Sequence, residues 1–524
     1  MVTKLRALDP KELTGFCETL KKEVISRVSD KIPHLESSLA VAELTVALHY
    51  VLRTPEDVLI WDVGHQGYIH KALTGRLDQL ENQRTTGGIS GFLKRDESPY
   101  DFFGAGHAST SISALAGVCI ADGASGLARH RVAVIGDGSL TGGQSFEALN
   151  HLSTIDTNAL VVLNDNDGSI DPTIGGLHAS GDYQRYFESL GWTYSTCTDG
   201  HDLSVVVPAL QERLAAGGKQ VLHVRTKRPD LSPPKSYKPG TTFQWWAAQE
   251  METLLTAYPK LQVISPAMFA GSGFAPLREQ FSERLHDTGI TEPHAVTLAA
   301  GMAAAGASPW VHIYSTFLQR AIDQVIHDVA LQRLPVVFLV DRAGLVGSDG
   351  ATHHGVFDAG MLHDVPGATI WQPKDGDELQ AMMREAAKLQ STLTGPLFIR
   401  YPKSKTTCET RVEFSPFTQA TSLGSNALLV STGALSAHVD QDLFDHIHLA
   451  QTKPLPAAFC ELLKRYDSLV LLEEANGFGG MSGSVTSFVS KEDVDLQVVV
   501  RKIPDAFTDH GMRNELLKGY GLIS

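Results

Sequence analysis

The chain has 524 residues, of which 43% are hydrophobic and 20% are charged. Because a domain usually contains about 150 residues, this length predicts roughly three domains, each with its own core. The 59 acidic residues outnumber the 44 basic ones, and the net charge of −15 argues against a general nucleic-acid or anionic-membrane binder.

Short runs of β-branched residues alternate with helical patterns, which is typical of parallel sheets covered by helices. In the first half, strands are predicted at 132–135, 159–163 and 221–224, with a helix at about 143–152. The stretch at 229–240 is rich in Pro and can continue neither a helix nor a central strand. We therefore expect an interdomain linker there.

Beyond this stretch the α/β pattern restarts with a predicted helix at about 243–258. The strands predicted after it are 262–265, 310–314, 336–340, 397–402, 427–430 and 469–472. The pattern predicts an α/β protein with two large doubly wound domains and a smaller C-terminal α/β domain. The expected ranges are 1–228, a linker at 229–242, 243–407 and 408–524.

Oxygen ligands follow two of the predicted strands. The first strand runs into Gly136-Asp137-Gly138, and the next ends in Asn164-Asp165-Asn166-Asp167-Gly168. Ligands of open α/β sheets collect at the carboxyl ends of strands, and Mg²⁺ prefers oxygen ligands. Asp137 and Asn166 are therefore candidate metal ligands. Asp165 and Asp167 are interpreted as solvated turn residues.

A lone Gly-Asp-Gly is common in surface turns, but its spacing to the Asn resembles the thiamine diphosphate fingerprint. By that resemblance, Asp137, Asn166 and the Gly168 carbonyl hold Mg²⁺ against the diphosphate. Five further motifs lie at 34–39, 61–66, 106–113, 314–321 and 341–350. Together they resemble the 1-deoxy-D-xylulose-5-phosphate synthase family of the transketolase-like group, over nearly the whole chain.

The resemblance implies a thiamine-diphosphate- and Mg²⁺-dependent transferase with two small-molecule substrates. Pyruvate and D-glyceraldehyde 3-phosphate condense to 1-deoxy-D-xylulose 5-phosphate and CO₂, and the product feeds isoprenoid, thiamine and pyridoxal biosynthesis. Glu292 matches the family's catalytic Glu, whose carboxyl contacts N1′ of the cofactor pyrimidine. That role requires a partly apolar pocket.

The family's other site residues carry over one by one. His34, His107, His353 and Asp349 match catalytic positions, and His34, His353 and Asp349 also match substrate contacts. Arg320 and Arg400 coincide with phosphate-binding arginines, and Arg342 and Tyr314 with further substrate contacts. The positions expected to contact the cofactor are His65, Gly106, His107, Gly138, Ser139, Asn166, Lys227, Glu292 and Phe317. His354 is expected to support His353 or to be solvated.

The chain also departs from the family. It is shorter than family members usually are, because few residues separate Ile170 from Gly191 where the family has a segment that covers the site. The family's glycine-rich stretch after Lys227 is replaced by 228–230. Glu36, Ser38, Gly67 and Pro293 stand where Ala, Asn, Ala and Gln are usual. We expect a trimmed site that keeps its ligands.

Alternatives remain open at this point. One is a transketolase-type transfer of a two-carbon ketol unit or another acyloin synthesis, and another is a catalytically silent thiamine diphosphate binder. The resemblance implies a homodimer. The five cysteines are scattered and form no CxxC pair, and no apolar run approaches the roughly 18 residues of a membrane span. A cytoplasmic protein with no membrane or nucleic-acid partner is expected.

Overall fold

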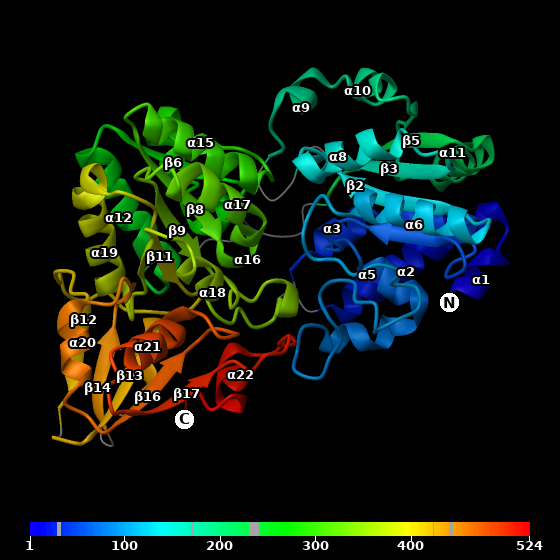
Figure 1. Ribbon diagram of the computed structural model, residues 1–524. Helices are drawn as coiled ribbons and strands as arrows, with labels where there is room; N and C mark the ends of the chain where they lie inside the picture. The colour runs from blue at the N-terminus through cyan, green and yellow to red at the C-terminus, as the bar shows by residue number, and fades with distance from the viewer. Residues whose placement is uncertain are drawn as a thin grey trace. The chain divides into compact units, whose positions relative to one another are not determined.

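The computed structural model (Figure 1) describes residues 1–28, 33–166, 168, 172–229, 240–422, 424–439 and 444–523. The chain divides into two compact units. Unit 1 comprises Met1–Pro234 and Gly289–Thr291, and unit 2 comprises Lys235–Thr288 and Glu292–Ser524. The predicted linker at 229–242 lies mostly outside the described residues, and the predicted domain boundaries stay predictions.

Unit 1 contains a five-stranded parallel sheet in the order β1-β2-β3-β5-β4. Its strands are β1 Val58–Trp61, β2 Arg131–Gly136, β3 Ala159–Asp165, β4 Thr193–Cys197 and β5 Lys219–Arg225. Successive side chains of β2 enter two different cores, with Val132 and Val134 in one and Ala133 and Ile135 in the other. The sheet is therefore covered on both faces, as its continuous apolar runs require.

Helices surround this sheet. They are α1 Val2–Arg6, α2 Leu13–Arg27, α3 Leu35–Ala40, α4 Ala42–Val51, α5 Tyr68–Lys71, α6 Ser111–Ser125, α7 Asp137–Leu140, α8 Gly143–Leu152, α9 Gly176–Ser180, α10 Tyr183–Ser189 and α11 Leu203–Ala216, with short 3₁₀ or π segments Pro10–Glu12, Ala72–Arg76 and Leu77–Asn82. Helix α8 has the predicted bounds. The short α9 and α10 lie in the stretch between Ile170 and Gly191, where a trimmed segment is expected from the sequence.

The strand register brings three strand ends to one edge of this sheet. Gly136 at the end of β2 lies opposite Asn164 of β3, and Asp165 at the end of β3 lies opposite Arg225 at the end of β5. Because the strands are parallel, the residues that follow them emerge at the same edge. Asp137, Asn166 and the residues after Arg225 are thereby gathered.

Unit 2 contains two sheets. The larger has the order β15-β10-β11-β9-β8-β6-β7 and is parallel except for β15. Its strands are β6 Leu261–Ser265, β7 Leu285–Asp287, β8 Ser308–Tyr314, β9 Val337–Asp341, β10 Thr369–Trp371, β11 Leu397–Tyr401 and β15 Gln451–Lys453. Strand β15 comes from the C-terminal part of the chain, which thereby supplies an edge strand to the preceding sheet.

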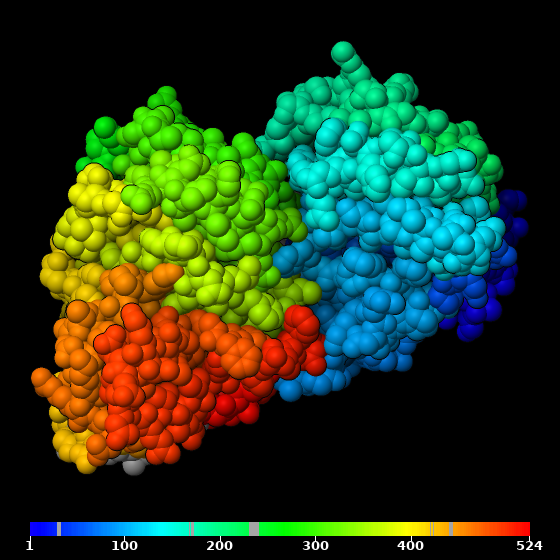
Figure 2. All heavy atoms as spheres, in the orientation of Figure 1, coloured from blue at the N-terminus to red at the C-terminus, as the bar shows by residue number. Residues whose placement is uncertain are grey.

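The second sheet of unit 2 has the order β12-β14-β13-β16-β17. Its strands are β12 Phe417–Thr421, β13 Ala427–Ser431, β14 Asp445–Leu449, β16 Ser468–Glu473 and β17 Gln497–Lys502. Only the β12–β14 pair is antiparallel. In Figure 2 this C-terminal part, in orange and red, packs directly against the green and yellow part of the same unit.

The helices of unit 2 complete the predicted α/β class. They are α12 Phe243–Ala257, α13 Phe269–Ser272, α14 Leu277–Gln280, α15 Glu292–Ala304, α16 Ser315–Leu318, α17 Ile322–Gln324, α18 Asp358–His363, α19 Gly376–Leu389, α20 Ala457–Leu463, α21 Gly480–Lys491 and α22 Arg513–Gly519, with short 3₁₀ or π segments Ser282–Arg284, Gln319–Ala321, Val325–Ala330, Gly350–Thr352, Gln390–Thr392 and Gly433–His438. Three sheets with helices confirm the α/β fold class. Among the described residues, no helix combines the length and hydrophobicity needed to cross a bilayer.

A buried ion-pair network holds the segment that leads to the 106–113 motif. Both Asp101 oxygens accept from Arg76, at 2.6 and 2.7 Å, and Asp101 Oδ1 also contacts His70 Nε2 at 3.0 Å. The Lys94 amide donates to Asp101 Oδ2 at 3.1 Å. Burial by itself raises the pKa of Asp101, but the hydrogen bonds with Arg76 and His70 outweigh it and hold that pKa well below its usual range.

We expect Asp101→Asn to lower the free energy of unfolding by about 3 kcal/mol at pH 7, because buried Arg76 loses its two short carboxylate contacts and keeps the longer one to Glu97 at 3.4 Å. The pKa of Asp101 is lowered in the folded state, so its stabilisation is present above the unfolded pKa and fades as the pH falls below it. Urea unfolding at pH 7 and at pH 3 measures both effects. Asp78→Asn, which removes an exposed partner of Arg27, should cost less than about 1 kcal/mol; equal losses would contradict the assignment.

Candidate active site

Asp137 is a buried carboxylate at the edge of the unit 1 sheet. It begins α7 directly after β2, is 2% exposed, and its Oδ2 accepts from Thr173 Oγ1 at 2.7 Å. Burial raises the pKa of Asp137, and the charge of Asp165 raises it further. A carboxylate in this position is stabilised by a nearby cation, so its environment fits a metal ligand.

The oxygens of Asn166 and Gly168 already converge on one cation. Arg228 Nη2 donates to Asn166 Oδ1 at 3.2 Å and to the Gly168 carbonyl at 2.5 Å. The described residues contain no group of three or more His, Cys, Asp and Glu side chains that could hold a metal ion. The predicted set, by contrast, has a single carboxylate, with an amide and a backbone carbonyl, and this all-oxygen set fits Mg²⁺.

The interpretation of Asp165 as a solvated turn residue is wrong. Asp165 belongs to β3, is 2% exposed, and contacts His223 Nε2 at 2.8 Å and Arg225 Nη1 at 3.0 Å. Neighbouring strand β5 supplies both partners, which the local sequence does not reveal. Asp167 lies outside the described residues.

Two predicted histidines of unit 1 lie side by side. His34 precedes α3 with a φ of 71°, and its ring centroid is 5.7 Å from that of His65. Burial, with a smaller effect of Arg228, lowers the pKa of His65 to about 4, so His65 is neutral at pH 7. His65 Nδ1 is buried and has no hydrogen-bond partner in the described part of the chain. Such an atom fits a site completed by a polar ligand.

The loop with Gly106 and His107 is tied to the Gly-Asp-Gly helix. Asp62 accepts the amides of Ser109 at 2.8 Å and Ser111 at 3.0 Å. Ser109 Oγ donates to the Ser139 carbonyl at 2.7 Å, which couples this loop to buried Gly138 and Ser139 in α7. Asp62 and Thr173 are not among the predicted site residues. Asp62 lies inside the 61–66 motif, whereas no sequence pattern marks Thr173.

Lys227 follows β5 at the same sheet edge and is exposed. Its backbone amide donates to His201 Nε2 at 2.8 Å, which fixes the chain direction just before Arg228. The expected contact of the Lys227 ammonium with the diphosphate stays a prediction.

Glu292 is the buried carboxyl of unit 2. It is the first residue of α15 and is 3% exposed, and Arg320 Nη1 lies 3.5 Å from its Oε2. Burial raises the pKa of Glu292, and the charge of Arg320 only partly opposes this. A carboxyl with a raised pKa can carry the proton needed to donate a hydrogen bond to a ring nitrogen, so Glu292 fits its predicted role.

Four predicted substrate and cofactor residues of unit 2 form one cluster. The rings of Tyr314 and Phe317 stack with centroids 5.5 Å apart, and Phe317 meets His353 edge to face at 5.6 Å. Arg342 Cζ lies 4.0 Å from the Tyr314 ring centroid, and Arg342 also pairs with Asp341. The structure therefore brings these four residues together from β8, α16 and the loops after β9.

The remaining predicted residues of unit 2 have other partners. Arg400 is 3% exposed and forms two hydrogen bonds of 2.7 Å with Asp358, and Lys403 lies 3.6 Å from Asp349. His354 is buried rather than solvated, since its Nδ1 accepts the Val346 amide at 3.0 Å and its Nε2 lies 3.2 Å from the Asp509 carbonyl. Phosphate binding by Arg320 and Arg400 stays a prediction.

The raised pKa of Glu292 predicts a pH-dependent stability effect. Because the folded state holds the Glu292 proton more tightly than the unfolded state, ionisation of Glu292 destabilises the fold as the pH rises. We expect Glu292→Gln to raise the Tm of the cofactor-free protein at pH 8, with the gain shrinking towards pH 4. Calorimetry at both pH values measures this difference. A Tm that falls at pH 8 would mean that the Arg320 contact outweighs the cost of burial.

Comparisons with known proteins identify relatives of the whole chain. Residues 1–182 match the family described as 1-deoxy-D-xylulose-5-phosphate synthase, and residues 242–408 match the transketolase pyrimidine binding domain. The 1-deoxy-D-xylulose-5-phosphate synthase of Leptothrix cholodnii is 39% identical, with 99% of this chain and 94% of that protein covered. That of Magnetococcus marinus is 38% identical, with 99% and 96% covered.

The alignment with the Leptothrix protein spans 607 positions, more than the 524 residues of this chain, so the relatives contain segments without a counterpart here. The transketolase of Leishmania mexicana, at 16% identity and a TM-score of 0.46 over 98% of this chain and 96% of that one, is too distant to add to the assignment.

The matches define a transketolase-like enzyme, a transferase that uses thiamine diphosphate and a divalent metal such as Mg²⁺. Within that class, the chain belongs to the 1-deoxy-D-xylulose-5-phosphate synthase family.

Proposed function

We propose that the protein condenses pyruvate with D-glyceraldehyde 3-phosphate, releasing CO₂ and forming 1-deoxy-D-xylulose 5-phosphate. The observation that carries this proposal is Glu292, a carboxyl 3% exposed and with a raised pKa at the start of α15. It stands inside the part of the chain that matches a pyrimidine-binding domain. The names of the relatives, at 38–39% identity, support the same reaction.

When bound, thiamine diphosphate supplies a thiazolium that takes up the electron pair left by departing CO₂. The Glu292 carboxyl would donate a hydrogen bond to the pyrimidine N1′ and exchange a proton with it. Asp137, Asn166 and the Gly168 carbonyl would hold Mg²⁺. Gly106, Gly138 and Ser139 would line the cofactor site, Lys227 would neutralise the phosphates, and Phe317 would contact the ring.

The substrates are held by the other predicted residues. Arg320, Arg342 and Arg400 offer guanidinium groups, the best match to the oxygens of the aldehyde's phosphate, and Tyr314 lines the same site. Near neutral pH, histidine is suited to moving protons, and His34, His107 and His353 take this role with Asp349. His65 is neutral and can hydrogen-bond the bound ligands through Nδ1.

We also propose a domain organisation, an oligomeric state and a cellular compartment. Residues 1–228 would bind the diphosphate, residues 243–407 the pyrimidine, and residues 408–524 would form the C-terminal domain. The protein would work as a homodimer, as the family resemblance implies, and in the cytoplasm. All five cysteines are free thiols, which is typical of a reducing compartment.

The test is an assay with pyruvate and D-glyceraldehyde 3-phosphate, with and without Mg²⁺ and thiamine diphosphate, followed by product identification. We expect CO₂ and 1-deoxy-D-xylulose 5-phosphate only when both cofactors are present. Product from a ketol donor, without CO₂ from pyruvate, would instead indicate a transketolase-type transfer. Tight cofactor binding without any turnover would indicate a silent binder.

A further inference from the structure

Arg228 occupies the place predicted for the metal ion. Its Nη2 donates to Asn166 Oδ1 at 3.2 Å and to the Gly168 carbonyl at 2.5 Å, and these are two of the three predicted metal-ligand atoms. The third ligand, Asp137, is also an electrostatic partner of Arg228. All these residues belong to unit 1. The guanidinium of Arg228 therefore contacts two predicted ligands and interacts electrostatically with the third.

A metal ion and this guanidinium compete for the same oxygens. Mg²⁺ binds oxygen at about 2.0–2.1 Å, so an ion bound to the Gly168 carbonyl would lie within about 5 Å of Arg228 Nη2. Two cations at that separation repel each other. The same oxygens can bind either the metal ion or the Arg228 guanidinium, but not both at once.

Two departures from the family pattern meet at this point. Arg228 stands in the segment that replaces the family's glycine-rich stretch, and Glu36, which stands where Ala is usual, interacts electrostatically with Arg228. Glu36 belongs to α3, which follows His34. A cation and an anion therefore accompany each other beside the predicted ligands.

The exposure of Arg228 makes the contact easy to exchange. Arg228 is exposed as a residue, but burial around its guanidinium lowers its pKa. Leaving the ligand oxygens would return this guanidinium to water, whereas Arg400 is 3% exposed and is held by Asp358. The contact of Arg228 is therefore suited to being broken by an incoming ion.

We propose that Arg228 is a built-in placeholder cation, which neutralises the Mg²⁺ site before the cofactor binds and which the metal must displace. This inference rests on the proposed function, because it takes Asp137, Asn166 and Gly168 as the metal ligands. Its consequence is that a free divalent ion, which has to break the Arg228 contacts, binds weakly.

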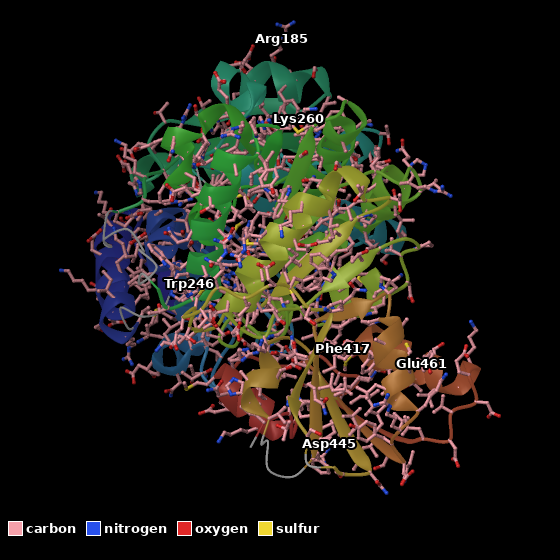
Figure 3. The ribbon with its side chains drawn as sticks, turned by 90° about the vertical axis from the view of Figure 1, so that its left-hand side faces the viewer. Arg185, Trp246, Lys260, Phe417, Asp445 and Glu461 are labelled. Atoms are coloured by element: carbon pink, nitrogen blue, oxygen red, sulfur yellow. The ribbon has the colours of Figure 1, made fainter. Side chains whose placement is uncertain are left out.

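The test measures Mn²⁺ binding to the cofactor-free protein by electron paramagnetic resonance, since Mn²⁺ accepts the same oxygen ligands as Mg²⁺. We expect Arg228→Gln to lower the Kd for Mn²⁺ about tenfold, because the loss of a competing charge-assisted hydrogen bond is of that order. Arg228→Lys keeps the charge and should stay closer to the wild type. Arg185→Gln is the control for net charge, because Arg185 is an exposed residue of α10 that extends outward in Figure 3; its Kd should equal that of the wild type.

The Asp137→Asn variant distinguishes a failure of the proposed metal site from a failure of the proposed role of Arg228. If it abolishes Mn²⁺ binding while Arg228→Gln leaves the Kd unchanged or raises it, the placeholder role is overturned and the metal site stands. If Asp137→Asn has no effect on Mn²⁺ binding, the metal site itself is wrong, and the placeholder role falls with it. An unchanged Tm in Arg228→Gln would show that the altered Kd does not come from a damaged fold.

Discussion

Replacing Asp137 with asparagine is expected to abolish Mg²⁺-dependent binding of thiamine diphosphate, and turnover with it. Asp137 supplies the only carboxylate of the predicted ligand set, and it is 2% exposed at the end of β2. An amide keeps the shape but loses the charge that holds the divalent ion. We expect the Kd for the cofactor, measured by isothermal titration calorimetry with Mg²⁺ in excess, to rise by at least about a hundredfold.

The matched control is Asp165→Asn at the same sheet edge. Asp165 is equally buried, but it is paired with His223 and Arg225. The Asp165 variant should lose stability because these partners are left uncompensated, while its cofactor affinity at Mg²⁺ saturation stays within a few-fold of the wild type. If the Asp165 variant lost more cofactor affinity than the Asp137 variant, Asp165 rather than Asp137 would be the metal ligand, and the assignment of Asp137 would be wrong.

Glu292→Gln is expected to keep cofactor binding and to lose turnover. The Gln side chain is isosteric with Glu, so the contacts that hold the diphosphate are unchanged. It cannot share a proton with the pyrimidine N1′, and loss of such a group costs about 10²–10⁴-fold in rate. We expect kcat to fall by that factor with a Kd for thiamine diphosphate within about tenfold, which steady-state kinetics and calorimetry measure.

Glu250→Gln tests whether any buried glutamate of unit 2 would give this result. Burial also raises the pKa of Glu250, and its partner is Arg384 at 2.9 Å in α19. Because ionisation of Glu250 likewise destabilises the fold, this variant should leave the Tm at pH 8 unchanged or raise it, while kcat stays close to the wild-type value. A comparable loss of kcat in both variants would indicate that Glu292 acts through the stability of unit 2.

The sequence was sufficient to predict the central strands and several helices. Helix α8 has its predicted bounds, and α12 ends at Ala257, one residue before the predicted end. Buried parallel strands are apolar throughout and their helices are amphipathic, so both leave a clear pattern. Strand β15, of three residues, leaves none, because it is defined by pairing with distant β10. Short edge strands depend on tertiary contacts that composition does not encode.

Two departures from the family pattern have local explanations. Gly67 stands where Ala is usual, and a Cβ there would lie 2.9 Å from Leu93 Cδ2 and 3.1 Å from the Gly64 carbonyl. Ser38 stands where Asn is usual, and its Oγ accepts the Tyr68 amide at 3.3 Å. Both residues pack the segment around His65. The sequence alone shows that Gly67 and Ser38 differ from the usual residues, but it does not show which neighbouring residues they contact.

The candidate site was predicted unevenly. The motifs correctly predicted that the Glu292 carboxyl is buried. The sequence around Glu292 indicates the start of a helix as well as the identity of the residue. They did not predict that Asp165 is engaged by β5 or that Arg228 reaches the Asn166 and Gly168 oxygens. These contacts join residues about sixty positions apart in the chain. They depend on how the strand ends are placed side by side, which local sequence does not specify.

The most direct test of the central claim is the rate at which the C2 proton of thiamine diphosphate exchanges with deuterium when the cofactor is bound with Mg²⁺. Quenched-flow NMR of the wild type, Glu292→Gln and Glu250→Gln compares the three proteins. If Glu292 activates the cofactor that Asp137 anchors, exchange is fast in the wild type and in Glu250→Gln and at least about a hundredfold slower in Glu292→Gln. Equal exchange rates in all three, with the cofactor fully bound, would contradict the claim.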